Sequence, residues 1–213
     1  MELAATTLTW YTARAGGLLA FTLVSASVVL GLALAGRARS PRWPAFALED
    51  VHRFLGILAG AFIAIHGLAL LVDGFFNFTL SSLLVPGTAP ARVVPVAFGV
   101  VAAELLAALA VTNHYRKQIP HWMWRRLHYL NFAVWGLALV HGITAGSDSH
   151  LYWVAGLFAA SGGAVLGLLA WRLMRRRAVA PWPRRLWPAA GGVFAAELIV
   201  ALTLGPLGLH AIG

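Results

Sequence analysis

The sequence predicts an all-α integral membrane protein, a six-helix bundle forming a single domain over residues 1–213. Three observations predict this class. The chain is 60% hydrophobic and only 11% charged, whereas soluble globular proteins are about a quarter charged. Six apolar segments each reach the roughly 20 residues that a helix needs to cross the hydrocarbon core. These segments do not alternate in polarity and are too long for the strands of a membrane barrel.

The six expected spans follow the apolar segments in chain order. They are residues 15–36, 50–72, 93–113, 126–146, 151–173 and 186–209. The first has no charge inside it, the second and fourth each carry two histidines, and the fifth is apolar up to Arg172. The third and sixth each carry one glutamate, Glu104 and Glu197. Between the second and third spans, three phenylalanines fit an interfacial helix or a cap: Phe75, Phe76 and Phe78.

The basic residues predict the orientation of the bundle. Of the 16 Lys and Arg residues, 14 flank the first, third and fifth loops, and only Arg14 and Arg92 lie on the other side. The positive-inside rule therefore places these three loops in the cytoplasm and both termini outside. The 14 residues are Arg37, Arg39, Arg42, Arg53, Arg116, Lys117, Arg125, Arg126, Arg172, Arg175, Arg176, Arg177, Arg184 and Arg185.

The charge and the cysteine content of the chain limit which partners and which cofactors are expected. The net charge of +9 comes from residues beside apolar runs, which favours membrane lipid headgroups as partners and no nucleic acid. The absence of cysteine excludes disulfides and cysteine-ligated iron–sulfur clusters. The first residues lack the basic region of a signal peptide, so no cleavage is expected. No Gly-x-Gly-x-x-Gly motif follows a strand, so no flavin or nicotinamide domain is expected.

Four histidines on two spans carry the candidate chemistry. His52 and His66 are fourteen residues apart, and His128 and His141 are thirteen apart. Both spans run outward, and these spacings correspond to roughly 21 and 20 Å along a helix. His52 should therefore lie level with His128 near the cytoplasm, and His66 level with His141 near the outside. Two facing imidazoles at each level provide the axial ligands of two stacked b-type haems, with the four histidines binding the iron.

The spacing of the histidines also bears on the regularity of the helices and on the alternatives to haem. Fourteen residues return a helix to within about 40° of the same face, but thirteen miss it by about 140°. The fourth span is therefore locally distorted, or its two histidines approach their haems from different sides. Gly136 and Gly142 could accommodate either arrangement. A zinc site needs its ligands around one ion, which four histidines spread over about 20 Å cannot provide. A transporter would place carboxylates beside the histidines, and the interiors of these spans have none.

Small and basic residues surround the predicted ligands. Gly56 and Gly60 share the broad face of the second span with its histidines, as does Gly67, and allow close approach of either a macrocycle or another helix. Some arginines are candidates for haem propionates: Arg53, Arg125 and Arg126 inside, where membrane topology is the alternative explanation, and Arg14 and Arg92 outside.

Other polar residues have weaker assignments. Glu104 and Glu197 lie near mid-membrane, where carboxylates are costly, and a quinone or proton role is open for them. His150 with Asp148 is a candidate contact for an external acceptor. The tryptophans near the histidines are interpreted as interface anchors without an electron-transfer role: Trp122, Trp124 and Trp135.

Two segments carry a family resemblance. DVHRFLG at 50–56 continuing to HG at 66–67, and WRRLHYLN at 124–131 continuing to LVHG at 139–142, resemble the ferric-reductase-like transmembrane domain family. That family includes the membrane domains of NADPH oxidases and ferric reductases, and the haem subunit that supplies a bacterial periplasmic methionine sulfoxide reductase. The resemblance implies an inner haem on His52 and His128, an outer haem on His66 and His141, and a bacterial inner (plasma) membrane location.

These features together lead to a functional expectation. We expect an oxidoreductase membrane subunit that transfers electrons through two haem b groups. The donor would be a separate flavoprotein or a quinol, and the acceptor an external ferric chelate, oxygen or a partner reductase. Two alternatives stay open at this point: a quinone-linked cytochrome b that anchors a dehydrogenase, and a haem-free transporter or scaffold.

Overall fold

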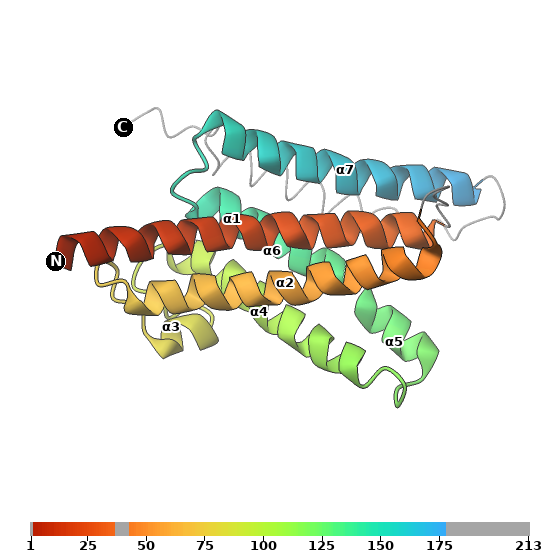
Figure 1. The fold of residues 1–213 in the computed structure, drawn as a ribbon, viewed down its shortest axis with the longest axis horizontal. Coiled ribbons are helices and arrows are strands. Elements are labelled where there is room, and N and C mark those ends of the chain that lie inside the picture. The colour runs from red at the N-terminus through yellow and green to blue at the C-terminus, as the bar shows by residue number, and fades with distance from the viewer. Residues whose placement is uncertain (1, 37–42, 178–213) are drawn as a thin grey trace.

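The computed structural model describes residues 2–36 and 43–177, and within these ranges the regular structure is entirely helical (Figure 1). The predicted sixth span, residues 186–209, and Glu197 lie outside the described residues. The helices are α1 (Glu2–Ala35), α2 (Ala45–Val72), α3 (Leu80–Leu84), α4 (Val93–His114), α5 (His121–His128), α6 (Asn131–Ala145) and α7 (Tyr152–Arg177).

Four of the described helices are long and apolar enough to cross a membrane. They are Thr7–Ala35, Ala45–Val72, Val93–His114 and Tyr152–Met174, which correspond to the predicted first, second, third and fifth spans. Along α2, large apolar side chains remain exposed, among them Phe54, Ile57, Leu68 and Val72. An apolar surface of this kind suits contact with lipid. The all-helical class and the membrane character are therefore supported within the described chain.

The predicted fourth span differs from the structure. Residues 126–146 do not form one helix, because α5 ends at His128 and α6 begins at Asn131. At the break, the Tyr129 and Leu130 amides donate to carbonyls three residues back, at 3.2 and 2.9 Å, which tightens the chain. The Asn131 side-chain amide donates to the His128 carbonyl at 2.8 Å and satisfies a group freed by the break. A local distortion is one of the two arrangements that the thirteen-residue spacing left open, and it lies at Tyr129 and Leu130 and not at Gly136 or Gly142.

Two helices begin well before their predicted spans. α1 begins at Glu2 rather than at residue 15, and α2 begins at Ala45 rather than at residue 50. A hydropathy pattern detects the apolar part of a helix, whereas the backbone hydrogen bonds continue into its more polar end. In the predicted cap, α3 starts with a capping box in which Thr79 and Ser82 bond reciprocally.

The chain reverses direction from one long helix to the next, so α2 and α6 run parallel (Figure 1). α1 packs mainly on α2, α4 packs on α6, and α1 also contacts α6 and α7. The core lies between α1, α6 and α7. Its members include Phe21, Trp135, Leu139, Val154, Phe158 and Val165.

Trp135 occupies the centre of this core. Only 3% of it is exposed, and its indole N–H lies 3.2 Å from Ser25 Oγ and 3.0 Å from Ser161 Oγ. Ser161 Oγ in turn donates to Ser25 Oγ at 2.8 Å. The interpretation of Trp135 as an interface anchor is therefore wrong. The residue instead ties α1, α6 and α7 together through a buried hydrogen-bond network.

Candidate functional site

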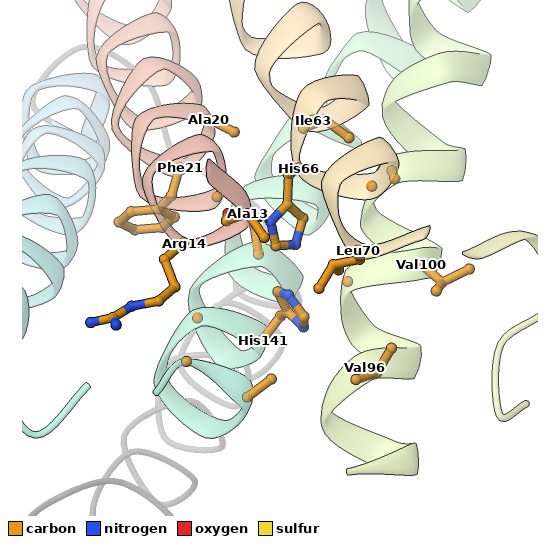
Figure 2. Close-up of a pocket in the computed structure, with 18 of the residues that line it drawn as sticks. Ala13, Arg14, Ala20, Phe21, Ile63, His66, Leu70, Val96, Val100 and His141 are labelled. Atoms are coloured by element: carbon orange, nitrogen blue, oxygen red, sulfur yellow. Dashed lines mark hydrogen bonds between the residues drawn. The ribbon is translucent and has the colours of Figure 1, made fainter. Parts of the chain in front are cut away.

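The four histidines meet in two pairs, one at each end of the parallel helices. His52 of α2 and His128 of α5 have ring centroids 6.1 Å apart and ring planes at 72°. His66 of α2 and His141 of α6 have centroids 6.3 Å apart and planes at 75°. The pairs are the ones that the sequence spacing predicts. Figure 2 shows His66 and His141 projecting toward each other from their two helices.

The separation within each pair suits one metal ion between two imidazoles. Two rings that bind a metal from opposite sides, with bonds of about 2.0–2.1 Å as found for zinc, have centroids about 6 Å apart. α2 and α6 are not among the helix pairs in close packing contact. The histidines therefore face each other across a space between two helices and not across a tight helix interface.

Three of the four rings are held at Nδ1 by a backbone carbonyl. The distance from Nδ1 to the carbonyl oxygen is 2.9 Å for His52 and Ser27, 2.7 Å for His66 and Ala13, and 2.9 Å for His141 and Pro95. A carbonyl only accepts, so Nδ1 carries the hydrogen in each ring. Nε2 is then left unprotonated, and this is the arrangement that metal-binding histidines usually show. Two of these acceptors, Ala13 and Ser27, lie on α1, and the third, Pro95, lies on α4.

His128 is held differently. Its Nδ1 lies 3.4 Å from the Asn131 side-chain nitrogen, and no carbonyl contacts it at hydrogen-bond distance among the described residues. Its ring stacks on Trp124, with centroids 5.1 Å apart and planes at 24°. Trp124 also stacks on His121 at 5.7 Å. The prediction of Trp124 as a membrane-interface anchor did not include this contact with a predicted ligand.

A cavity of about 660 Å³ surrounds the outer pair. This volume lies within the usual range of about 300–1,000 Å³ for small-molecule sites. Side chains of several helices line it, most of them apolar (Figure 2). Ser147 also lines the cavity, and its buried hydroxyl has no hydrogen-bond partner within the described chain. The cavity thus offers two facing imidazoles, apolar walls and one unsatisfied polar group.

The glycines nearest the histidines are not the predicted ones. A Cβ added at Gly56 or Gly60 would meet nothing within 4 Å, so these positions are open but do not contact a histidine. A Cβ added at Gly17, Gly31 or Gly99 would instead lie 3.1 Å from His66, 3.2 Å from His52 and 2.7 Å from His141. The signal that could have identified two of them is their spacing, because Gly17 and Gly31 are fourteen residues apart, as are the histidines of α2.

The predicted arginines mostly have partners within the protein. Arg14 lines the cavity but forms an ion pair with Asp148, and its Nε donates to Oδ2 at 2.7 Å. Its guanidinium points away from the outer pair in Figure 2. Arg92 donates to the Thr144 carbonyl at 3.0 Å while also lining the cavity.

The inner arginines are exposed on the surface. Arg53 bonds Asp50 at 3.3 Å, Arg126 lies over the Trp122 ring, and Arg125 is exposed on α5. The structure therefore does not bring them onto the inner histidine pair.

Of the remaining candidates, Asp148 lines the larger cavity, whereas His150 and Glu104 do not. Asp148 bonds Arg14, while His150 is exposed in the turn before α7. Glu104 is exposed on α4 and does not line the larger cavity. Within residues 2–36 and 43–177, no group of three or more His, Asp or Glu side chains is arranged to hold a metal ion. Comparison with protein-family models, curated proteins and solved structures finds no match.

Proposed function

We propose that this chain is a membrane cytochrome b of the ferric-reductase-like type, which moves single electrons across a bacterial inner membrane. The donor is a separate flavoprotein or a quinol on the cytoplasmic side. The acceptor is an external ferric chelate, oxygen or a partner reductase. The observation that carries the proposal is the meeting of four histidines in two pairs of matched geometry.

The residues at the outer level fit a haem, and the inner pair shares the ring separation of the outer pair. The ring separation suits a metal between the imidazoles, and the missing Cβ of Gly99 leaves room for the His141 ring. The apolar cavity wall suits a macrocycle, and Ser147 and Arg92 at the cavity are candidates to bind its carboxylates. When bound, haem supplies the one-electron couple, and the protein supplies ligation and electrostatics.

The histidines also determine what chemistry the site favours. If haem binds, His52 with His128 and His66 with His141 would hold its iron, and no position would be left for oxygen or substrate to bind the metal. This arrangement favours electron transfer over oxygen activation. Fourteen residues separate the two levels on α2, or about 21 Å along the helix. That separation covers most of the roughly 30 Å hydrocarbon core, as a transmembrane path requires.

A vesicle experiment tests whether the chain carries electrons across a membrane. The full chain is reconstituted with haem into liposomes that enclose ferricyanide, and dithionite is added outside. Each dithionite-derived electron that crosses reduces one ferricyanide ion, which loses its colour. We expect rapid bleaching with the native protein and a loss of at least tenfold with His66→Ala or His141→Ala. His114→Ala, an exposed histidine at the end of α4, is the matched control and should not change the rate.

The outcomes separate the proposal from its alternatives. Haem-containing protein that bleaches no ferricyanide would contradict transmembrane transfer and favour the quinone-linked anchor. Colourless protein that transports ions would favour the transporter or scaffold.

A further inference from the structure

We infer that α1 and α4 position the proposed haem ligands through carbonyl–glycine cradles, with Gly17, Gly31 and Gly99 as positioning residues. A cradle is defined here as a backbone carbonyl that accepts from a histidine Nδ1, together with a glycine four residues later that lies against the same ring. This inference rests on the proposed function, because it assigns the ring nitrogen opposite the cradle to the metal.

The first two cradles lie on α1. At the outer level, Ala13 accepts from His66 at 2.7 Å, and a Cβ at Gly17 would lie 3.1 Å from His66 Nδ1 and 3.2 Å from its Cε1. At the inner level, Ser27 accepts from His52 at 2.9 Å, and a Cβ at Gly31 would lie 3.2 Å from His52 Cε1. Both glycines therefore sit where a larger residue would press on the ligand ring.

The two cradles on α1 repeat at the spacing of the histidines on α2. The carbonyls and the glycines are each displaced by fourteen residues, and so are His52 and His66. Fourteen residues return a helix to within about 40° of its starting face. Because α1 and α2 run antiparallel, one packing register brings both cradles against both histidines. The repeat thus places two ligands with a single helix–helix interface.

The third cradle lies on α4 and serves the partner ligand. Pro95 accepts from His141 at 2.9 Å, and a Cβ at Gly99 would lie only 2.7 Å from His141 Nδ1. The physical reason for the four-residue offset is common to all three cradles. In a helix the carbonyl of residue i already accepts from the amide of residue i+4, but its second lone pair stays available. Without a Cβ at residue i+4, an imidazole can approach that lone pair from the side.

The fourth ligand lacks a cradle. His128 stands beside the α5–α6 break, where Asn131 and Trp124 contact it instead. Donation from Nδ1 to a carbonyl raises the basicity of the ligand and so favours the oxidised metal. The outer centre therefore has two cradled ligands, and the inner centre has one.

Single glycine substitutions in the full, haem-loaded chain test this arrangement. Gly17→Ala and Gly99→Ala should each raise the midpoint potential of the outer centre alone, and Gly31→Ala that of the inner centre alone. Gly99→Ala should act most strongly, up to loss of the outer haem, because its added Cβ comes closest to a ring. Redox titration followed by absorption and electron paramagnetic resonance resolves the two centres.

Two glycines of α7 serve as controls. A Cβ at Gly156 or Gly163 would meet nothing within 4 Å. Gly156→Ala and Gly163→Ala should leave both potentials unchanged. Cradle variants that behave like these controls, or that shift both centres equally, would overturn the inference.

A measurement on the unmodified protein covers variants that fail to fold. In reduced, diamagnetic protein labelled with ¹⁵N-histidine, three ligand Nδ1 protons should resonate downfield as carbonyl-bonded protons, and one should not. Four equivalent protons would overturn the cradle assignment while leaving the two haems, and so the proposed function, intact. A native protein that binds no haem would overturn both.

Discussion

In three of the four proposed ligand histidines, Nδ1 is hydrogen-bonded to a backbone carbonyl and Nε2 is left for a metal. The carbonyls of Ala13, Ser27 and Pro95 fix the hydrogen on Nδ1 and limit rotation of each ring. A ring that is fixed before a ligand binds loses less conformational freedom on binding. The ring planes within the pairs are consequently set by α1 and α4 as much as by the helices that carry the histidines.

The angle between paired rings leads to a spectroscopic prediction. The planes meet at 72° in the inner pair and 75° in the outer pair. Near-perpendicular axial imidazoles give oxidised low-spin haem a strongly anisotropic resonance with one large g value, whereas parallel rings give a three-line rhombic spectrum. We expect the anisotropic type from both centres by electron paramagnetic resonance of frozen oxidised protein. A rhombic spectrum from both would show that the rings do not hold these orientations.

At the residue scale, the sequence predicts the histidine pairs but not their surroundings. Spacing along two parallel helices was enough to match His52 with His128 and His66 with His141. The spacing of Gly17 and Gly31 matches that of His52 and His66 and was a signal for two of the glycine contacts. The contact of Gly99 has no such signal, because it depends on the register of α4 against α6. The Arg14–Asp148 ion pair likewise joins residues that are distant in the chain, and no local pattern indicates it.

At the scale of elements, the bundle depends on the contact between α1, α6 and α7. Trp135 provides the centre of this contact, with two serine hydroxyls from the neighbouring helices around its indole nitrogen. The α5–α6 break lies just before Trp135 in the chain. His128 therefore belongs to α5 and precedes the helix that packs in the core. The position of His141 therefore depends on how firmly α6 is held.

The Trp135 network leads to a stability prediction. Trp135→Phe removes the indole N–H while Ser25 and Ser161 remain bonded to each other at 2.8 Å. We expect the free energy of unfolding to fall by about 1–3 kcal/mol, the usual effect of losing buried hydrogen bonds. Denaturant unfolding in detergent measures this change. Trp153→Phe, on a side chain that is 61% exposed, should have a much smaller effect, and equal losses from the two variants would argue against the network.

Helix positions were more predictable than helix ends. Apolar runs located α1, α2, α4 and α7 because each is a long, uninterrupted hydrophobic segment. The break at Tyr129 and Leu130 carries no glycine or proline, so local sequence signals do not mark it. The thirteen-residue histidine spacing was the one sequence signal that allowed for a distortion of this span, beside the alternative that its histidines approach from different sides.

At the scale of the whole molecule, two antiparallel helix pairs form the frame of the site. α1 with α2 is one pair, and α4 with α6 is the other. The histidines lie where the two pairs face each other, and the cavity of about 660 Å³ opens at the outer level. Because His52 and His66 both lie on α2, this frame places the two levels along one helix. The proposed function therefore requires that one chain hold two metal centres.

Counting haem in the purified full chain tests this requirement most directly. The protein is expressed with ample haem, its absorption is recorded oxidised and reduced, and haem is quantified per chain. We expect two low-spin b-type haems per chain, and one after His66→Ala or His141→Ala. His150→Ala, at an exposed histidine, should retain both. A native protein without haem, or one whose haem content is unaffected by the His66 and His141 substitutions, would contradict the account.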